Sequence, residues 1–501
     1  MHSAALTLLI LLPLAGALLL VFSKDDRVTR WLALAFTASG FLATLLISYM
    51  AVSHESPEGR WLLYVELPWI ERYGVRFSLG MDGISMLLVL LTSFLFMLSV
   101  AVSWRVVREK VALFHAMLLL MEAGVLGVFL ATDLFLFYLF WEVMLVPMFF
   151  LIGIWGHGRR IYSAVKFFIY TVTGSLLMLL AIIGLYVIHG RQTGVYTFAL
   201  DALSKTPLDP ATGMWLFAAF MLGFAVKVPV FPLHNWLPDA HTDAPTAGSV
   251  ILAGLLLKTG AYGMIRFAFP LFPVAAKACL PVMFAAGIIG IFYASLIAFA
   301  QTDMKRLVAY SSISHLGLVV LGIAVWNDAS LAGSVLQMVN HGVTTGALFI
   351  MVGMMDERMH TRDINAYGGL WSKAPVMSSF FLLFILSSLG LPGLNNFVGE
   401  LLIFVGLFRG HPIVAGAALA GIVFTLAYLL RLAQKVLFGP SVNSGEFNDV
   451  SLRELSILVP LAALVLAIGL YPAMLLRPLD APVKGLVSAY YKAAGPGGVA
   501  R

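Results

Sequence analysis

The chain has 501 residues, of which 61% are hydrophobic and only 11% are charged, and its mean hydropathy is +0.96. Soluble globular domains carry about 25% charged residues, so this composition excludes a soluble protein and predicts one that is solvated by lipid. The formal net charge is +6, but the basic residues stand singly or in small groups between apolar segments, which excludes a nucleic-acid-binding protein and is typical of membrane topology.

Fourteen apolar segments of about 18 residues or more are bounded by charged or turn-forming residues. They predict an all-α, polytopic membrane protein with about fourteen transmembrane helices, and the connections are too short for a separate soluble domain. The segments are 3–22, 28–50, 81–103, 111–131, 134–154, 162–189, 213–237, 247–269, 278–300, 307–325, 331–355, 376–408, 413–438 and 454–475.

The distribution of basic residues predicts the orientation of these helices. Connections assigned to the inner side hold 16 Lys and Arg residues, including Lys305, whereas those on the other side hold 8, including Arg60 and Arg266. Because cytoplasmic loops are enriched in Lys and Arg, we expect both termini to lie outside. The first segment has no basic residue before it and Lys24 just after it, so we expect an uncleaved helix rather than a signal peptide.

A faint internal similarity predicts a repeated organisation. Ala131-Thr132-Asp133 opens the fifth segment, and Gln301-Thr302-Asp303 opens the tenth, five helices later. This offset indicates two five-helix repeats of opposite orientation in the membrane. We therefore expect N-terminal helices over 1–110, a first repeat over 111–270, a second repeat over 278–438, and a last helix with the tail over 439–501.

The seventh and twelfth segments are expected to be broken helices. Four prolines follow Lys227 before the eighth segment begins, and a proline removes a hydrogen bond from the helix and clashes with the preceding turn. Segment 376–408 would make a helix of about 50 Å, too long for one crossing, and Leu391-Pro392-Gly393 supplies its break.

Glu142 and Lys227 carry charge at a depth where lipid rejects it. Glu142 lies about 12 Å into its segment at 1.5 Å per residue, and Lys227 lies at a similar depth. A lysine there costs roughly 3 kcal/mol unless it faces a partner or water. We expect the two residues to pair, and a lysine balanced between burial and a carboxylate can release its proton when that carboxylate moves. The alternative is a static ion pair that only holds two helices together.

Further ionisable residues occur at the same depth in other segments. Lys258 lies in the eighth segment, His315 follows several serines in the tenth, and Glu400 adds a second carboxylate in the twelfth. A polar stripe along one face of the eleventh segment consists of Gln337, Asn340, His341, Thr344 and Thr345. Imidazoles in such a setting can pass protons along a water chain, or can be hydrogen-bonded for packing alone.

Three residues are expected to be accessory to this set. Glu122 could assist Glu142, and His234 lies in the polar connector after the broken seventh segment. Asp133 stands near a segment end, as does His115, so capping or an interfacial position is the simpler role for both.

No metal or cofactor site is predicted within the chain. Cys279 is the only cysteine, which excludes an internal disulfide and a cysteine-held iron–sulfur cluster. His315 and His341 could in principle hold a b-type haem, but that hypothesis leaves the lysines and carboxylates at the same depth without a role. Since charges inside a membrane more often mark ion pathways, we expect an ion pathway.

Several long segments resemble one known family. The chain contains VKVPVFPLHNWLPDAHTDAPTAGSVILAGLLLKTGAYG, DMKRLVAYSSISHLG, MVNHGVTTGALFI, ATDLFLFYLFWEVMLVPMFFLIGIWG and LPGLNNFVGELLIF. These segments closely resemble the antiporter-like membrane subunits of respiratory complex I, NADH:quinone oxidoreductase. The resemblance covers nearly the whole chain.

The resemblance implies fourteen helices with two inverted five-helix repeats, and it implies that six residues form a proton pathway: Glu142, Lys227, Lys258, His315, His341 and Glu400. A glutamate at position 400 is similar to the M-type branch of the family, whereas the L-type, N-type and cation/proton antiporter members usually carry lysine there.

The resemblance also implies an activity: proton translocation coupled to quinone reduction elsewhere in the enzyme. Flavin, iron–sulfur clusters and quinone would then belong to partner subunits, with no redox centre in this chain. The implied partners are L-type and N-type membrane subunits and the lipid bilayer, and the implied location is a bacterial inner membrane with both termini on the periplasmic side. Two alternatives share the fold, a subunit of a multi-subunit sodium/proton antiporter and the membrane subunit of a related hydrogenase complex.

Overall fold

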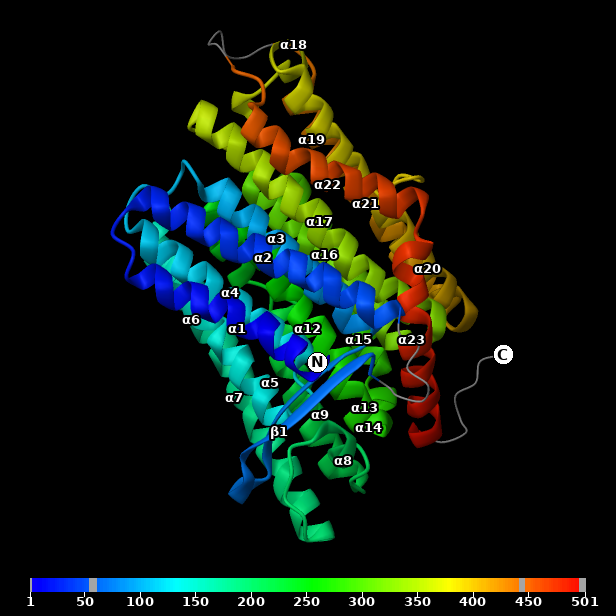
Figure 1. The fold of residues 1–501 in the computed structure, drawn as a ribbon. Coiled ribbons are helices and arrows are strands. Elements are labelled where there is room, and N and C mark those ends of the chain that lie inside the picture. The colour runs from blue at the N-terminus through cyan, green and yellow to red at the C-terminus, as the bar shows by residue number, and fades with distance from the viewer. Residues whose placement is uncertain (1, 54–60, 441–446, 495–501) are drawn as a thin grey trace. The chain divides into compact units, whose positions relative to one another are not determined.

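The computed structural model describes residues 2–53, 61–440 and 447–494 (Figure 1). In these residues, 12 helices are long and apolar enough to cross a membrane, and two shorter apolar helices, Ala5–Val21 and Pro375–Ser388, accompany them. The predicted class, a helical polytopic membrane protein, is confirmed, while the count of fourteen crossings stays a prediction. Arg60 and the end of the predicted tail, 495–501, lie outside the described residues.

The contacts between residues divide the chain into two compact units. The first unit holds the chain up to Val228, Leu255–Pro281 and the region after Arg477, whereas the second holds Pro229–Gly254 and Val282–Arg477. This division does not test the repeat boundaries expected near residues 110, 270 and 438, which stay a prediction.

The first unit consists mainly of helices and one β-hairpin. Its elements are α1 (His2–Val21), α2 (Asp26–Ser53), β1 (Leu63–Ile70), β2 (Val75–Met81), α3 (Gly83–Ser103), α4 (Val111–Leu130), α5 (Leu134–Val143), α6 (Leu145–Trp155), α7 (Arg160–Thr193), α8 (Leu200–Leu203), α9 (Pro210–Lys227), α12 (Leu257–Gly263), a π-helical segment Met264–Ala268, α13 (Phe269–Leu271) and α14 (Pro273–Ala278), with most of α23 (Ala473–Ala494).

The second unit is helical. Its elements are α10 (Trp236–Asp243), α11 (Thr246–Ile251), most of α15 (Leu280–Ala300), α16 (Met304–Val325), α17 (Asp328–Met359), α18 (Leu370–Lys373), α19 (Pro375–Ser388), α20 (Asn395–Gly410), α21 (Pro412–Leu437) and α22 (Leu452–Leu470). A second π-helical segment, Leu252–Leu256, joins α11 to α12.

The β-hairpin was not predicted, because the search along the sequence was for apolar runs and residues 51–80 counted only as a polar connection. β1 and β2 pair antiparallel, with Leu63 opposite Met81, and Gly74 closes the turn at a φ of 66°. A Cβ at Gly74 would lie 1.9 Å from the carbonyl oxygen of Tyr196, so only glycine fits there. The β-branched and aromatic residues of β1 and the glycine in the turn are the signals that could have revealed it.

Both predicted helix breaks are confirmed. Helix α9 ends at Lys227, and the chain runs through turns before α10 begins at Trp236. The other break lies between α19 and α20, where Gly390 and Gly393 have φ values of 70° and 91°, and Pro392 stands between them. Left-handed backbone is strained for residues with a Cβ, so these glycines make the second break possible.

The similarity between Asp133 and Asp303 extends to the backbone around each of them. Each aspartate caps the helix that follows it, Asp133 for α5 and Asp303 for α16. Each also lies in a short antiparallel bridge, Asp133 with Ala199 and Asp303 with Asp363. The two tripeptides therefore begin the same local structure, although the inverted repeats themselves stay a prediction.

Candidate proton-transfer site

Glu142 lies at the end of α5, where the helix is interrupted. Met144 forms a turn between α5 and α6, and Pro147 has no N–H to donate to the carbonyl oxygen of Val143. The sequence thus places a glutamate at a weak point of a membrane helix. Glu142 follows Tyr138 by four residues on the same helix and interacts with it electrostatically.

Lys227 is the last residue of α9, and its side chain is buried. Glu142 acts on it electrostatically, and its Nζ lies 5.5 Å from the ring centroids of both Trp141 and Phe167. Among the described residues, Nζ of Lys227 has no hydrogen-bond acceptor and Oε1 of Glu142 has no donor. The two groups therefore form no direct hydrogen bond, and the pairing of Glu142 with Lys227 stays a prediction.

The surroundings of Lys227 partly offset the cost of burying its charge. The C-terminus of a helix carries about half a negative charge, which stabilises a cation there, as do aromatic ring faces. These contacts are electrostatic, and none of them is a hydrogen bond that holds one particular N–H of the ammonium group in place. Small movements of Glu142 can therefore change the balance between the protonated and neutral forms of this lysine.

Lys258 is fully buried in α12, between the two π-helical segments Leu252–Leu256 and Met264–Ala268. Neither π segment was predicted, since no local sequence signal distinguishes them from α-helix. Such segments interrupt the regular hydrogen-bond pattern and are frequent at functional sites.

Gly260 brings α12 into close contact with α9 beside Lys227. A Cβ built at Gly260 would lie 2.7 Å from Cγ2 of Val228, 2.8 Å from the carbonyl oxygen of Phe224 and 3.1 Å from Cβ of Lys227. The structure therefore places Lys258 two residues away from the point where its helix contacts Lys227. Small residues at a helix interface allow such close packing.

We expect Gly260→Ala to lower the thermal stability of the protein in detergent by about 1–3 kcal/mol, because the added methyl group overlaps backbone atoms that cannot rotate away. Gly290→Ala is the matched control, since a Cβ at that buried position has no atom within 4 Å. Melting curves of the two purified variants check this. Equal melting temperatures would show that α9 and α12 can separate without loss of stability.

His315 and Glu400 lie together in the second unit. Nδ1 of His315 is 3.5 Å from Oε1 of Glu400, and the Ser388 hydroxyl is 3.2 Å from its Nε2. Gln337 donates to the same Glu400 oxygen at 3.3 Å. Gly390 leaves room for this carboxylate, because a Cβ there would lie 2.5 Å from Oε2 of Glu400. Like Lys227, Glu400 therefore lies beside a helix break.

His341 lies next to this pair, with its ring centroid 5.7 Å from that of His315. The polar stripe predicted on its helix exists, but it holds the second helix break together. Asn340 donates to the carbonyl oxygen of Asn395 at 2.7 Å, and the Thr344 hydroxyl accepts from Asn396 at 2.9 Å. The stripe thus satisfies polar groups at the start of α20 and fixes the helix that carries Glu400.

Glu122 and His234, two of the predicted accessory residues, have neighbours outside the predicted pathway. Oε1 of Glu122 is 3.7 Å from a Cβ built at Gly40 of α2, so this buried carboxyl faces α2. The ring of His234 packs against those of Phe231 and Tyr293, at centroid distances of 5.6 and 5.1 Å. Any assistance from Glu122 or His234 stays a prediction.

Asp133 has the capping role that its position suggested. Its carboxylate accepts the backbone N–H groups of Phe135 and Leu136, at 2.9 and 3.0 Å. Burial raises the pKa of Asp133 to about 6, although these amides oppose the shift. His115 is fully buried and its Nδ1 lies 2.8 Å from the carbonyl oxygen of Val111, so it bonds to its own helix.

One buried ion pair was missed. Nη2 of Arg266 donates to Oδ2 of Asp82 at 2.6 Å, and its Nε donates to the Tyr262 hydroxyl at 3.2 Å. Arg266 was assigned to an outer loop, which is wrong because its side chain is 1% exposed inside a membrane helix. Lys305, assigned to an inner loop, is also buried, with its Nζ bonded to the carbonyl oxygen of Ala244. Omitting Lys305 from the inner count and Arg266 from the outer count leaves the excess of Lys and Arg on the inner side nearly unchanged.

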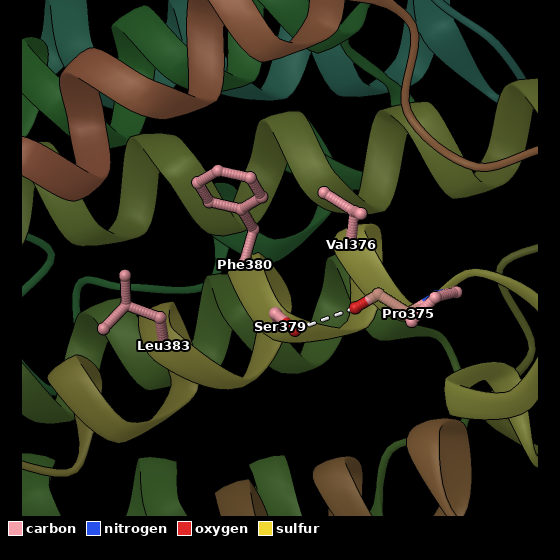
Figure 2. A pocket seen from close by; sticks show the side chains of 5 residues that line it. All are labelled: Pro375, Val376, Ser379, Phe380 and Leu383. Atoms are coloured by element: carbon pink, nitrogen blue, oxygen red, sulfur yellow. Dashed lines mark hydrogen bonds between the residues drawn. The ribbon is translucent and has the colours of Figure 1, made fainter.

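A pocket of about 310 Å³ lies on α19, away from the ionisable residues. Figure 2 shows its lining side chains, Pro375, Val376, Ser379, Phe380 and Leu383. The Ser379 hydroxyl donates to the carbonyl oxygen of Pro375 at 2.8 Å, and the other lining side chains are apolar. No acidic or basic side chain lines this pocket, so it is not the candidate site.

Comparisons with known proteins match the chain over most of its length. A family model described as NADH:quinone oxidoreductase/Mrp antiporter, TM, matches residues 131–425. The sequence is 46% identical to NADH-quinone oxidoreductase subunit M of Pseudomonas aeruginosa, over 95% of this chain and 96% of that protein. A chain of respiratory complex I from Thermus thermophilus with bound NADH is 30% identical, with a TM-score of 0.88 over 97% of this chain and 100% of that one. A chain of the Mrp complex from Dietzia sp. has the same fold, with a TM-score of 0.84 and 20% identity over 98% of this chain and 99% of that one.

Proposed function

Because the chain belongs to the NADH:quinone oxidoreductase/Mrp antiporter family of membrane proteins, we propose that it is a proton-translocating membrane subunit of an NADH:quinone oxidoreductase. One observation carries the proposal: Glu142 and Lys227 interact inside the membrane helices at points where both helices are interrupted. Opposite charges at helix breaks inside a membrane are costly to maintain and can move, as a proton switch requires.

The proton steps follow from the chemistry of these groups. Lys227 holds a proton while Glu142 is charged and near, and it releases the proton when the carboxylate moves away or is neutralised. Lys258, on the adjacent helix, is the next acceptor in the first unit. In the second unit, His315 and Glu400 can exchange a proton over their 3.5 Å separation, with His341 beside them. The six residues together form the proposed pathway.

The energy for these steps comes from quinone reduction in partner subunits. We assign the flavin, the iron–sulfur clusters and the quinone to those partners, with no cofactor or metal in this chain. L-type and N-type membrane subunits are the proposed neighbours. The excess of Lys and Arg in alternate connections favours an inner-membrane protein with both termini on the periplasmic side.

The test is to purify an affinity-tagged copy of this chain from its host membrane. We expect it to co-purify with subunits that oxidise NADH and reduce quinone, and NADH to drive acidification of inverted vesicles in the absence of sodium. The chief alternative is a subunit of a sodium/proton antiporter. Sodium-dependent proton exchange in vesicles, without any associated NADH oxidation, would establish that alternative and overturn the proposal.

A further inference from the structure

Three buried hydroxyl groups meet where α15, α16 and α21 come together. Oγ of Ser295 lies 2.9 Å from Oγ of Ser314 and 3.3 Å from Oγ1 of Thr425, and the latter two are 3.5 Å apart. The exposed fractions of the three residues are 0, 3 and 4%. The three hydroxyls, one from each helix, form a closed triangle that we call the hydroxyl triangle.

These hydroxyls differ from most others in the buried helices. A serine or threonine in a helix usually bonds to a carbonyl oxygen of the preceding turn. Thr92 does so with Leu88, and Thr171 does so with Phe167, at 2.7 and 2.8 Å. The hydrogen bonds of Ser295 and Ser314, in contrast, cross from one helix to another, and Ser314 also contacts the carbonyl oxygen of Ile291. Helix stability alone does not require this arrangement.

A small cavity connects the hydroxyl triangle to the His315–Glu400 pair. Its volume is about 10 Å³, and the polar residues that line it are Ser314, His315, Ser388, Glu400 and Thr425. A cavity of this size with several polar partners can hold one water molecule. The same cavity therefore borders the carboxyl group of Glu400 and two corners of the triangle.

Tyr428 extends the polar cluster along α21. It is fully buried three residues after Thr425, and its hydroxyl has no hydrogen-bond partner among the described residues. A further buried hydroxyl group therefore lies along α21 beyond Thr425, and it is not bonded to the carbonyl oxygen of its own helix.

We propose that Thr425, Ser314 and Ser295 carry protons to and from Glu400, through a water molecule in this cavity. The inference rests on the proposed function and adds to it the route by which protons reach and leave Glu400. Each step breaks one O–H bond and forms another: the Glu400 carboxyl gives its proton to the water, the water gives one of its own to a triangle oxygen, and that hydroxyl passes its original proton to the next. A hydroxyl can accept and donate at once, which is what this relay requires.

Thr425→Val tests the relay, because valine keeps the shape of threonine and removes the hydroxyl. In membranes that contain the whole complex, we expect the ratio of the proton uptake rate to the NADH oxidation rate to fall roughly tenfold or more. NADH oxidation with an uncoupler present should remain, and Thr425→Ser should restore uptake. Thr92→Val is the matched control, since that buried threonine bonds to its own helix. Ser314→Ala serves the same purpose if Thr425→Val fails to assemble.

The outcomes separate this inference from the proposed function. Normal proton uptake in both Thr425→Val and Ser314→Ala, with uptake lost in Glu400→Gln, would overturn the relay and leave the function standing. Normal uptake in all three variants would overturn both. Slower uptake in Thr425→Val with a larger solvent deuterium isotope effect, and neither change in Thr92→Val, would establish the relay, because a packing defect does not alter the isotope effect.

Discussion

Replacing Lys227 with alanine will abolish proton pumping, while the assembled complex continues to oxidise NADH. The variant removes the only cation that interacts with Glu142 among the described contacts of that site. Without the amine of Lys227, a proton that crosses the membrane at this position meets an additional barrier of roughly 3 kcal/mol or more. A barrier of that size slows proton transfer by about 100-fold or more. NADH oxidation with an uncoupler and dye-reported acidification of inverted vesicles measure the two activities separately.

Lys166→Ala is the matched control for this variant. Lys166 also lies in an apolar helix, but it is partly exposed and its Nζ contacts the ring of Tyr162 at 5.6 Å. We expect normal pumping from it. Pumping retained in Lys227→Ala would contradict the assignment of Lys227 to the pathway.

The partner of Lys227 gives a graded version of the same prediction. Glu142→Ala should also abolish pumping, whereas Glu142→Asp should be milder, because it keeps the charge and withdraws it by about 1.5 Å. Equal losses in both variants would indicate that Glu142 has only a structural role.

Glu400→Gln will be the second variant with a large effect. Glutamine has nearly the same shape and keeps an oxygen for the amide of Gln337, but it cannot bind and release a proton at physiological pH. We expect pumping to fall by about 100-fold or more, with assembly and uncoupled NADH oxidation close to normal. The nearby His315 then has no carboxyl group with which to exchange a proton.

Asp328→Asn controls for the loss of a negative charge in the second unit. Asp328 is exposed at the first residue of α17, so we expect its replacement to leave pumping unchanged. A Glu400→Gln variant that pumps as well as Asp328→Asn would remove Glu400 from the pathway.

The sequence predicted the features that depend on local chemistry. The proline after Lys227 and the Pro-Gly pair near residue 392 act on their own helices, so both breaks were visible without a structure. Depth in the membrane follows from counting residues along an apolar segment, so Glu142, Lys227 and Lys258 could be placed at similar levels. The capping role of Asp133 follows from its position at a helix start.

The sequence did not predict the features that depend on contacts between residues far apart in the chain. Asp82 and Arg266 are 184 positions apart, and one sequence carries no signal that pairs them. The two π segments around Lys258 match no local sequence pattern that was recognised. Likewise, the polar stripe with Gln337 and Asn340 was visible, but its contact with the second helix break was not.

Infrared difference spectroscopy of the purified complex is the most direct test of the central claim, which is that carboxyl groups inside the membrane helices change protonation during turnover. Spectra recorded before and after NADH addition should contain a carboxyl C=O band that Glu142→Gln abolishes, and a second band that Glu400→Gln abolishes. Identical NADH-induced carboxyl bands in the unmodified protein and in both variants would contradict the account.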